Sequence, residues 1–396
     1  MHKHNLFFLF LMEVCAGAAR GAYLVCIGWT TLIVSGDVAR VGQVFIAGML
    51  TILIGSPLVG VIVDRYNRKT LTIIAHTGIA LGLGGLGHVM ATNESPEIFW
   101  FFVTVVAVTF LRMIYQSSHD GLIHANVPKE KVVHAVARFR GIHLLCTAIG
   151  TVATGIVIEE LSPDAGFFLA AMLSVLLVVA VVFVKGIVTR ENVAGFRGFV
   201  EDFAGGLALF REKPTLRSLT LLAGVALPLG QLSNAVLSSF IYDDLGRGSD
   251  VFGFVDAAWP IGGMAAAAVL SLGLRRLSAS GMEYLFAALG GLATVLLSMS
   301  SSVFGLALAH AAMGFTVWLC RIVIDGRVLQ ICSEHTVGRT KVYIEVMFSF
   351  AAVIMCLSPT LIKLEQTSQY FLFWGGFATV IALLLWFIGQ MNRVRP

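Results

Sequence analysis

Three arginines, Arg20, Arg112 and Arg321, lie inside long stretches of mostly apolar residues. An arginine at the centre of a membrane helix costs about 2.5 to 3.5 kcal/mol on insertion scales, so each of the three needs a reason to be there. A guanidinium group makes bidentate contacts with carboxylate or phosphate. These arginines therefore indicate a binding site for a small anion, and we expect the anion to carry several carboxylates.

Ion pairing within one helix accounts for only one of the three arginines. Asp325 lies at i+4 from Arg321, where a helix brings the two side chains together. Arg20 and Arg112 have no acidic residue at i±3 or i±4, and Glu13 would lie about two turns, or roughly 10 Å, from Arg20. Arg20 and Arg112 therefore bind either the substrate or groups on other helices, and we favour the substrate.

Further polar residues occur at a similar depth. Gln116, His119 and Asp120 follow Arg112 at i+4, i+7 and i+8, which gives that helix one polar face. The residues predicted to line the substrate site are Arg20, Arg112, Gln116, His119, Gln231, Asn234, His310, Trp318 and Arg321. A structural role for His119 and His310 stays open, since a lone histidine is more often a hydrogen-bonded core residue.

Four carboxylates are candidates for coupling transport to protons: Glu13, Asp120, Asp256 and Asp325. Coupling requires a carboxylate that burial keeps able to take up a proton. Glu13 is the first candidate because it shares a helix face with Arg20, although it could instead neutralise a basic partner permanently. The sequence has no GxxxxGK[ST] loop, so a proton gradient rather than ATP is the expected driving force and no cofactor is expected.

The sequence argues against several other classes of function. It has no HExxH motif, and its six cysteines are scattered without metal-ligand spacing, so neither a metal site nor an enzyme is expected. The net charge of +4 reflects the distribution of basic residues around a membrane rather than an affinity for nucleic acid.

The elements that must position these residues are membrane-spanning helices. Hydrophobic residues make up 57% of the chain and its mean hydropathy is +0.87, far above an ordinary soluble domain. At about 20 residues for each span, the chain has room for about twelve helices. Apolar run length predicts helices at 6–34, 41–63, 70–91, 98–120, 135–158, 165–187, 216–242, 250–274, 281–301, 303–331, 339–362 and 369–391. The first is read as a transmembrane helix rather than a cleaved signal peptide, because Glu13 interrupts its apolar run.

The polar stretch in the middle of the chain divides the helices into two sets of six. We expect an N-terminal six-helix bundle at 1–187, a cytoplasmic linker at 188–215 and a C-terminal six-helix bundle at 216–396. Phe199, Phe203, Leu207 and Phe210 recur at helical spacing in the linker, which predicts an amphipathic helix at the membrane surface.

The distribution of Lys and Arg predicts the orientation. With a cytoplasmic N-terminus, most of the 27 basic residues fall in cytoplasmic connections, whereas Arg40, Arg247 and Lys363 fall on the other side. We therefore expect an integral protein of a bacterial inner membrane with both termini in the cytoplasm. A monomer is expected, with the lipid bilayer and an anionic small molecule as its partners.

A charged hairpin between the second and third predicted helices carries a family resemblance. The segment "GVIVDRYNRK" contains Gly60, Asp64, Arg65 and Arg68, and it resembles the loop signature of the major facilitator superfamily. In that family such a loop acts as a cytoplasmic latch, with the glycine allowing close helix approach and the basic residues reaching lipid headgroups. Simple enrichment of positive charge in a cytoplasmic loop is the alternative reading.

The resemblance extends along the chain. Together with "GSPLVGVIVDRYNRK", the segments "NVPKEKVVHA" and "FVEDFAGGLALFREKPTLRSL" look most like the macrolide-efflux-like branch of the superfamily, which includes siderophore exporters. The resemblance implies two six-helix bundles that rock around a site near the middle of the bilayer, lined by helices one, four, seven and ten. It implies proton-coupled export of a siderophore-like carboxylate.

Three other functions stay open. Multidrug or macrolide efflux is the second reading, although three buried arginines suit anions better than cationic drugs. Import of the same anions is the third, since the fifth helix reads "GTVATG" at 150–155 and lacks the proline common in exporters. A membrane receptor or scaffold that transports nothing also stays open, although such a protein would have no need for polar side chains in the middle of the membrane.

Overall fold

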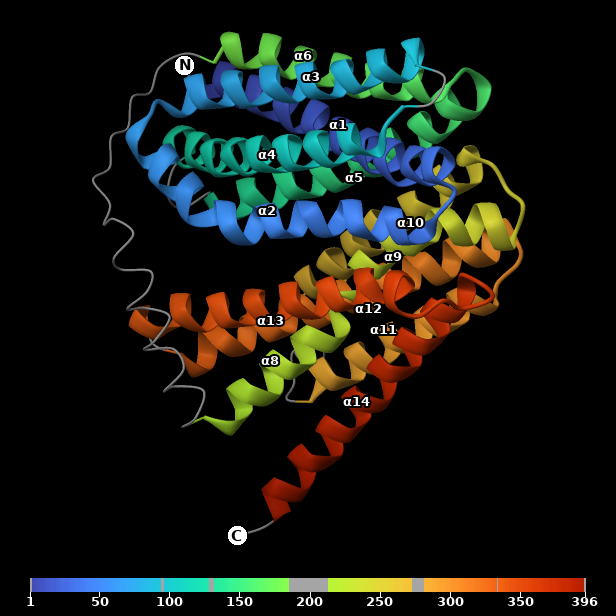
Figure 1. Ribbon diagram of the computed structural model, residues 1–396. Coiled ribbons are helices and arrows are strands. Elements are labelled where there is room, and N and C mark those ends of the chain that lie inside the picture. Colours follow the sequence, from blue (N-terminus) through green and yellow to red (C-terminus); the bar gives the residue numbers. More distant parts are fainter. Residues whose placement is uncertain are drawn as a thin grey trace. The chain divides into compact units, whose positions relative to one another are not determined.

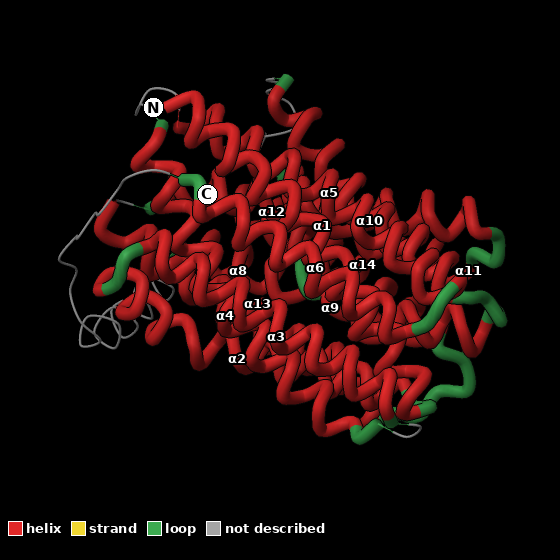
Figure 2. The backbone as a smooth tube through the Cα atoms, turned by 90° about the horizontal axis from the view of Figure 1, so that it is seen from above, coloured by secondary structure: helices red, strands yellow, loops and turns green. Residues whose placement is uncertain are grey.

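The computed structural model of this chain describes residues 2–93, 96–127, 132–184, 213–272, 281–332 and 334–394. In these ranges the backbone consists of long helices joined by short turns, as Figure 1 and Figure 2 show. The helices of the first half are α1 (His2–Ser35), α2 (Val38–Arg65), α3 (Arg68–Thr92), α4 (Ile98–Asn126), α5 (Val132–Glu160) and α6 (Pro163–Val182). Those of the second half are α8 (Pro214–Ala226), α9 (Leu229–Ser239), the π-helical turn η2 (Phe240–Asp244), α10 (Ser249–Ser271), α11 (Met282–Met299), α12 (Val303–Ile331), α13 (Glu334–Leu361) and α14 (Ser368–Val394).

The lengths of these helices fit a membrane. Within the described residues, eleven helical spans are long and apolar enough to cross a bilayer, and the shorter apolar helix Met282–Ser298 adds one more. The prediction of an all-α membrane fold with about twelve spans is therefore confirmed. The predicted linker helix at 188–215 lies outside the described residues, apart from the start of α8.

Two compact units are present among the described helices. The first consists of α1 to α6 together with Arg247–Ala257, the beginning of α10. Those residues belong to it because the Ser249 hydroxyl donates to Gly155 O at 3.0 Å and to Glu159 at 2.9 Å. The second unit consists of α8, α9, the remainder of α10 and α11 to α14.

Glycines bring α1 and α5 into backbone contact inside the first unit. A Cβ added to Gly21 would lie 2.2 Å from Thr147 O, and one added to Gly150 would lie 2.2 Å from Ala18 O. Side chains larger than hydrogen would force the helices apart, and small residues at such crossings are typical of membrane helix packing. This close approach places the polar residues of α1 directly beside those of α5.

The seventh predicted span differs from the expected continuous helix 216–242. It breaks between α8 and α9 at Leu227–Pro228 and ends in the π-helical turn η2. Pro228 has no backbone N–H to donate and its ring clashes with the preceding turn, so the break has an identifiable cause. Gln231 and Asn234 lie on α9, directly after this break.

Candidate functional site

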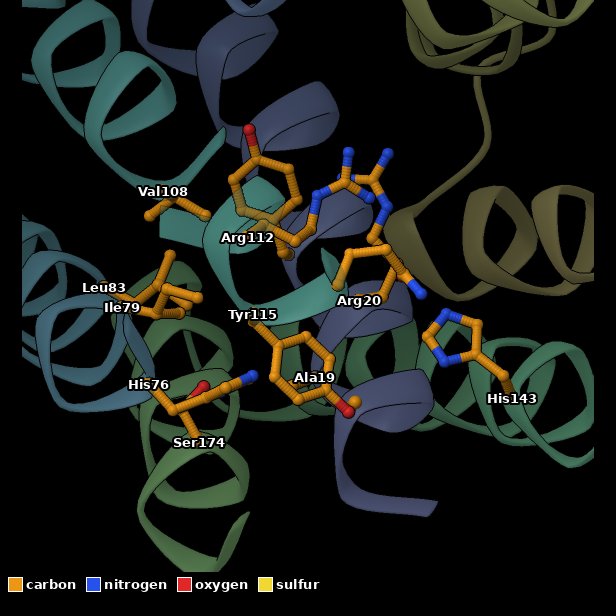
Figure 3. Close-up of a pocket in the computed structure, with 13 residues that line it drawn as sticks. Ala19, Arg20, His76, Ile79, Leu83, Val108, Arg112, Tyr115, His143 and Ser174 are labelled. Carbon is orange, nitrogen blue, oxygen red and sulfur yellow. The ribbon is translucent and has the colours of Figure 1, made fainter. Parts of the chain in front are cut away.

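Arg20 of α1 and Arg112 of α4 line one pocket inside the first unit. The two like charges are close enough to interact, and Figure 3 shows both side chains extending to the same side of the pocket. Arg20 also lies over the ring of Tyr23, 5.3 Å from its centroid. No acidic side chain of the described residues forms a salt bridge with either arginine. Neither guanidinium group is thus neutralised by a direct ion pair within the described residues.

The pocket is small, and both polar and apolar side chains line it. Its volume is about 40 Å³, which holds a few water molecules or one arm of a ligand. Its lining residues belong to α1, α3, α4, α5 and α6. The lining residues are Ala16, Ala19, Arg20, Tyr23, His76, Ile79, Leu83, Val108, Arg112, Tyr115, Gln116, His143 and Ser174.

A larger and more open cavity adjoins this pocket. Its volume is about 340 Å³, within the size range of small-molecule sites, and it is formed by α2 and α4. Arg112 and Gln116 line both spaces, so they stand between the cavity and the pocket. Gly60 also lines the cavity, and a Cβ there would meet no atom of the described chain within 4 Å. No other described helix therefore approaches Gly60 closely within the first unit.

Glu13 lies at the centre of a buried polar cluster. Its side chain is 2% exposed, and its two carboxylate oxygens lie 2.7 Å from His143 Nδ1 of α5 and 3.0 Å from His119 Nδ1 of α4. The contact with His143 has hydrogen-bond geometry, whereas the contact with His119 is close but poorly aligned. The basic partners of Glu13 are thus two histidines on other helices, which the sequence alone did not reveal.

His119 does not line the pocket with Arg112 as expected. It lies about two turns along α4 from Arg112, where it is fully buried beside Glu13 and beyond the residues that line the pocket. Asp120 does follow the Gln116 side and pairs with Arg140 at 3.2 Å, with both side chains about half exposed. Asp120 is therefore part of a hydrated ion pair.

Asp256 also belongs to the first unit. It lies on α10, is 9% exposed, and is within electrostatic range of Arg20 without a direct ion pair. It is thus the buried acid beside the pocket's arginines.

Arg321 of the second unit is occupied by two carboxylates. Its Nε donates to Asp325 at 3.3 Å, and its Nη2 donates to Glu345 of α13. The i+4 pairing expected with Asp325 is present, whereas Glu345 was not expected. These two carboxylates neutralise Arg321, which the sequence had predicted to bind the substrate.

Three of the other predicted residues of the second unit have protein partners: Gln231, Asn234 and His310. The Asn234 amide donates to Gln231 at 3.2 Å, and His310, which is 1% exposed, lies 2.9 Å from the Ser233 hydroxyl. The indole N–H of Trp318 is buried and has no hydrogen-bond partner among the described residues. These residues belong to the second unit and are not among those that line the pocket of Arg20 and Arg112.

The charged hairpin is held by the first unit itself. Lys69 Nζ donates to Val182 O and Val184 O, both at 2.7 Å, and so caps the end of α6. Arg68 packs against Gly121, where a Cβ would lie 2.3 Å from its guanidinium. Arg65 is exposed, and the side chain of Asp64 lies outside the described residues. Arg68 and Lys69 therefore both contact other parts of the first unit.

Comparison with protein families finds a match over most of the chain. Residues 9–355 match the model of the Major Facilitator Superfamily. Among solved structures, an alanine-substituted variant of the nucleoside transporter NupG superimposes with a TM-score of 0.79 at 14% identity, covering 96% of this chain and 98% of that one. An auto-inhibited POT family peptide transporter gives a TM-score of 0.72 at 13% identity over 99% and 97% of the two chains. At these identities the likeness concerns the fold alone.

Among curated proteins, the chain matches the multi-drug resistance efflux pump PmrA of Streptococcus pneumoniae in two strains. The match has 30% identity over 140 residues, which is 34% of this chain and 30% of the length of the relative. The membrane-length helices and the family match agree on an integral membrane protein. The chain therefore belongs to the Major Facilitator Superfamily.

Proposed function

We propose that this protein is a secondary transporter of a bacterial cytoplasmic membrane that exports a small, carboxylate-rich organic anion in exchange for protons. The anion binds at Arg20 and Arg112 and moves by alternating access of two six-helix bundles. The two termini face the cytoplasm. The substrate class is that of carboxylate siderophores and related organic acids.

One observation carries this proposal: Arg20 and Arg112, from two different helices, line the same pocket without a salt bridge to any described carboxylate. Two like charges in apolar surroundings repel each other and are costly to bury, and Asp256, the buried acid within electrostatic range of Arg20, forms no direct ion pair with either of them. An anion that contacts both guanidinium groups would remove the repulsion and satisfy their donors. Arg321 is left out of the substrate site because Asp325 and Glu345 already neutralise it.

Proton coupling is assigned to Glu13 and its two histidines. Glu13 is almost fully buried, but its partner His143 is 19% exposed and lines the arginine pocket. A proton that reaches His143 from the pocket is one hydrogen bond away from Glu13. Arrival of an anion beside His143 and loss of a proton from the cluster would then influence each other electrostatically.

The hairpin around Gly60, Asp64, Arg65 and Arg68 keeps its proposed role as a cytoplasmic latch. Support comes from its position next to the larger cavity, which Gly60 lines, and from Lys69, which ties the hairpin to the end of α6.

Multidrug efflux is the second candidate, and the partial match to PmrA favours it. A drug-sized ligand would need the larger cavity of about 340 Å³ rather than the arginine pocket. On this reading Arg20 and Arg112 would be structural, and cationic compounds rather than anions would bind.

The test is a thermal-shift panel on the purified full-length protein in detergent, comparing citrate and tricarballylate with a cationic dye and a macrolide. A ligand at a hundred times its dissociation constant stabilises the folded state by about 2.7 kcal/mol. We expect stabilisation by the tricarboxylates, lost in Arg112→Gln and retained in Arg138→Gln, whose arginine is exposed on α5. Stabilisation by the dye or macrolide alone would replace the anion proposal with the efflux reading.

A further inference from the structure

His76 and Tyr115 bring unpaired polar atoms into the arginine pocket. His76 of α3 is 3% exposed and Tyr115 of α4 is 2% exposed. Neither ring nitrogen of His76 nor the hydroxyl of Tyr115 has a hydrogen-bond partner among the described residues, and both side chains line the pocket. Buried polar atoms in proteins are nearly always paired, because leaving one unpaired costs about 1 to 3 kcal/mol. We therefore expect these atoms to form hydrogen bonds with a ligand or with water.

The two rings occupy a different side of the pocket from the arginines. Figure 3 shows the guanidinium groups at one side, His76 at the other and Tyr115 between them. The His76 and Tyr115 rings pack edge to face at 4.4 Å, which fixes the orientation of both. Ile79, Leu83 and Val108 form the apolar part of the wall. The pocket thus has a cationic side and a neutral, hydrogen-bonding side.

The charges around the neutral side exclude a second anionic group there. Glu13 is within electrostatic range of both His76 and Tyr115, and Asp120 is within range of Tyr115; these two acids disfavour a carboxylate at the rings, although Arg140 and His119 offset part of their effect. A neutral imidazole offers one donor and one acceptor, and a tyrosine hydroxyl can do both. A hydroxyl group on the ligand has the same combination and carries no charge, so it matches this side of the pocket.

We propose that His76 and Tyr115 form a subsite for a hydroxyl group, so that the substrate is a hydroxylated carboxylic acid. This inference rests on the proposed anion site at Arg20 and Arg112. Because Arg112 and Gln116 line both spaces, the body of the ligand occupies the larger cavity and a short arm passes Arg112 into the pocket. The pocket volume of about 40 Å³ suits such an arm.

A matched pair of ligands tests the subsite. Citrate and tricarballylate carry the same three carboxylates and differ by one hydroxyl group. We would measure the dissociation constant of each for the full-length protein in detergent by isothermal titration calorimetry. Sites built to bond a hydroxyl reject the analogue that lacks it, so citrate should bind at least about tenfold more tightly.

Three variants separate the subsite from the rest of the protein. Tyr115→Phe removes only the unpaired hydroxyl, and His76→Leu removes the ring nitrogens; each should reduce the citrate preference several-fold and leave tricarballylate affinity nearly unchanged. Thr72→Val is the control, because Thr72 is buried on the same helix, outside the pocket lining, and its hydroxyl donates to Arg68 O at 2.9 Å. This variant should keep the wild-type preference.

The outcomes distinguish this inference from the function on which it rests. Equal binding of the two acids to the wild type, or a preference that survives both Tyr115→Phe and His76→Leu, overturns the hydroxyl subsite and leaves the anion site standing. Failure of the wild type to bind either acid overturns both. A citrate preference lost in these two variants and kept in Thr72→Val supports the subsite.

Discussion

Glu13 of α1 and His143 of α5 form a 2.7 Å hydrogen bond between two helices whose backbones touch through glycines. Glu13 does not line the arginine pocket, but His143 does. The histidine therefore stands between a buried carboxylate and the space in which we place the substrate. We propose that this contact contributes to the stability of the first unit and to proton coupling.

Removing His143 should destabilise the protein. His143→Gln takes away the better aligned partner of a carboxylate that is 2% exposed, and losing a hydrogen bond to a charged group typically costs about 1.5 to 3 kcal/mol. His119 remains, so we expect the lower end, about 1.5 kcal/mol, measured as a fall in melting temperature in detergent. His88→Gln is the control, because His88 is exposed on α3. Equal melting temperatures for the two variants would show that the Glu13 contact contributes nothing.

The stability of the protein should also depend on the glycine contact between α1 and α5. In Gly150→Ala the new methyl group would meet Ala18 O at 2.2 Å, and overpacking of this kind costs about 1 to 3 kcal/mol. Gly141→Ala, on the same helix with open space around its Cβ, should be neutral or slightly stabilising. Melting temperatures of both variants test this prediction. If Gly150→Ala is as stable as Gly141→Ala, the two helices can move apart without cost.

Arg321 should behave as a structural ion pair. Its side chain is 30% exposed and that of Glu345 is 48% exposed, so a double-mutant cycle with Arg321→Gln and Glu345→Gln should give a coupling of at most about 1 kcal/mol. Tricarboxylate binding should be unchanged in Arg321→Gln. If this variant loses binding as Arg112→Gln does, Arg321 belongs to the substrate site as its sequence position indicated.

Lys69 should matter more for stability than its neighbour Arg65. Lys69→Met removes the donor that caps Val182 O and Val184 O at the end of α6, which should cost about 1 kcal/mol. Arg65→Met changes an exposed side chain and should cost less than about 0.5 kcal/mol. Similar melting temperatures for Lys69→Met and Arg65→Met would show that the contacts of Lys69 do not stabilise the protein.

The sequence predicts helices well because apolar run length reports directly on membrane spans. It places Arg20 and Arg112 correctly in one region, since their depth in two helices can be counted. It also predicts the pair of Arg321 with Asp325, which is local. His143, His76, Tyr115 and Glu345 were missed because their roles depend on contacts between helices, and a single sequence contains no information on which helix faces are in contact.

The break after α8 and the position of His119 show a second limit. Pro228 is visible in the sequence, but the apolar pattern continues through it, so run length alone indicates one helix. His119 was grouped with Arg112 by its spacing, whereas a polar helix face of this width can serve two environments. Here Gln116 faces the pocket and His119 faces Glu13.

The most direct test of the central claim is transport of labelled citrate by the full-length protein in proteoliposomes under an imposed pH gradient. The arginine pocket predicts gradient-driven citrate movement by the wild type and by Arg138→Gln, and a loss of at least about tenfold in Arg112→Gln. Movement of citrate at the same rate in Arg112→Gln and the wild type would contradict it, because the anion would then cross without the charge on which the proposal rests.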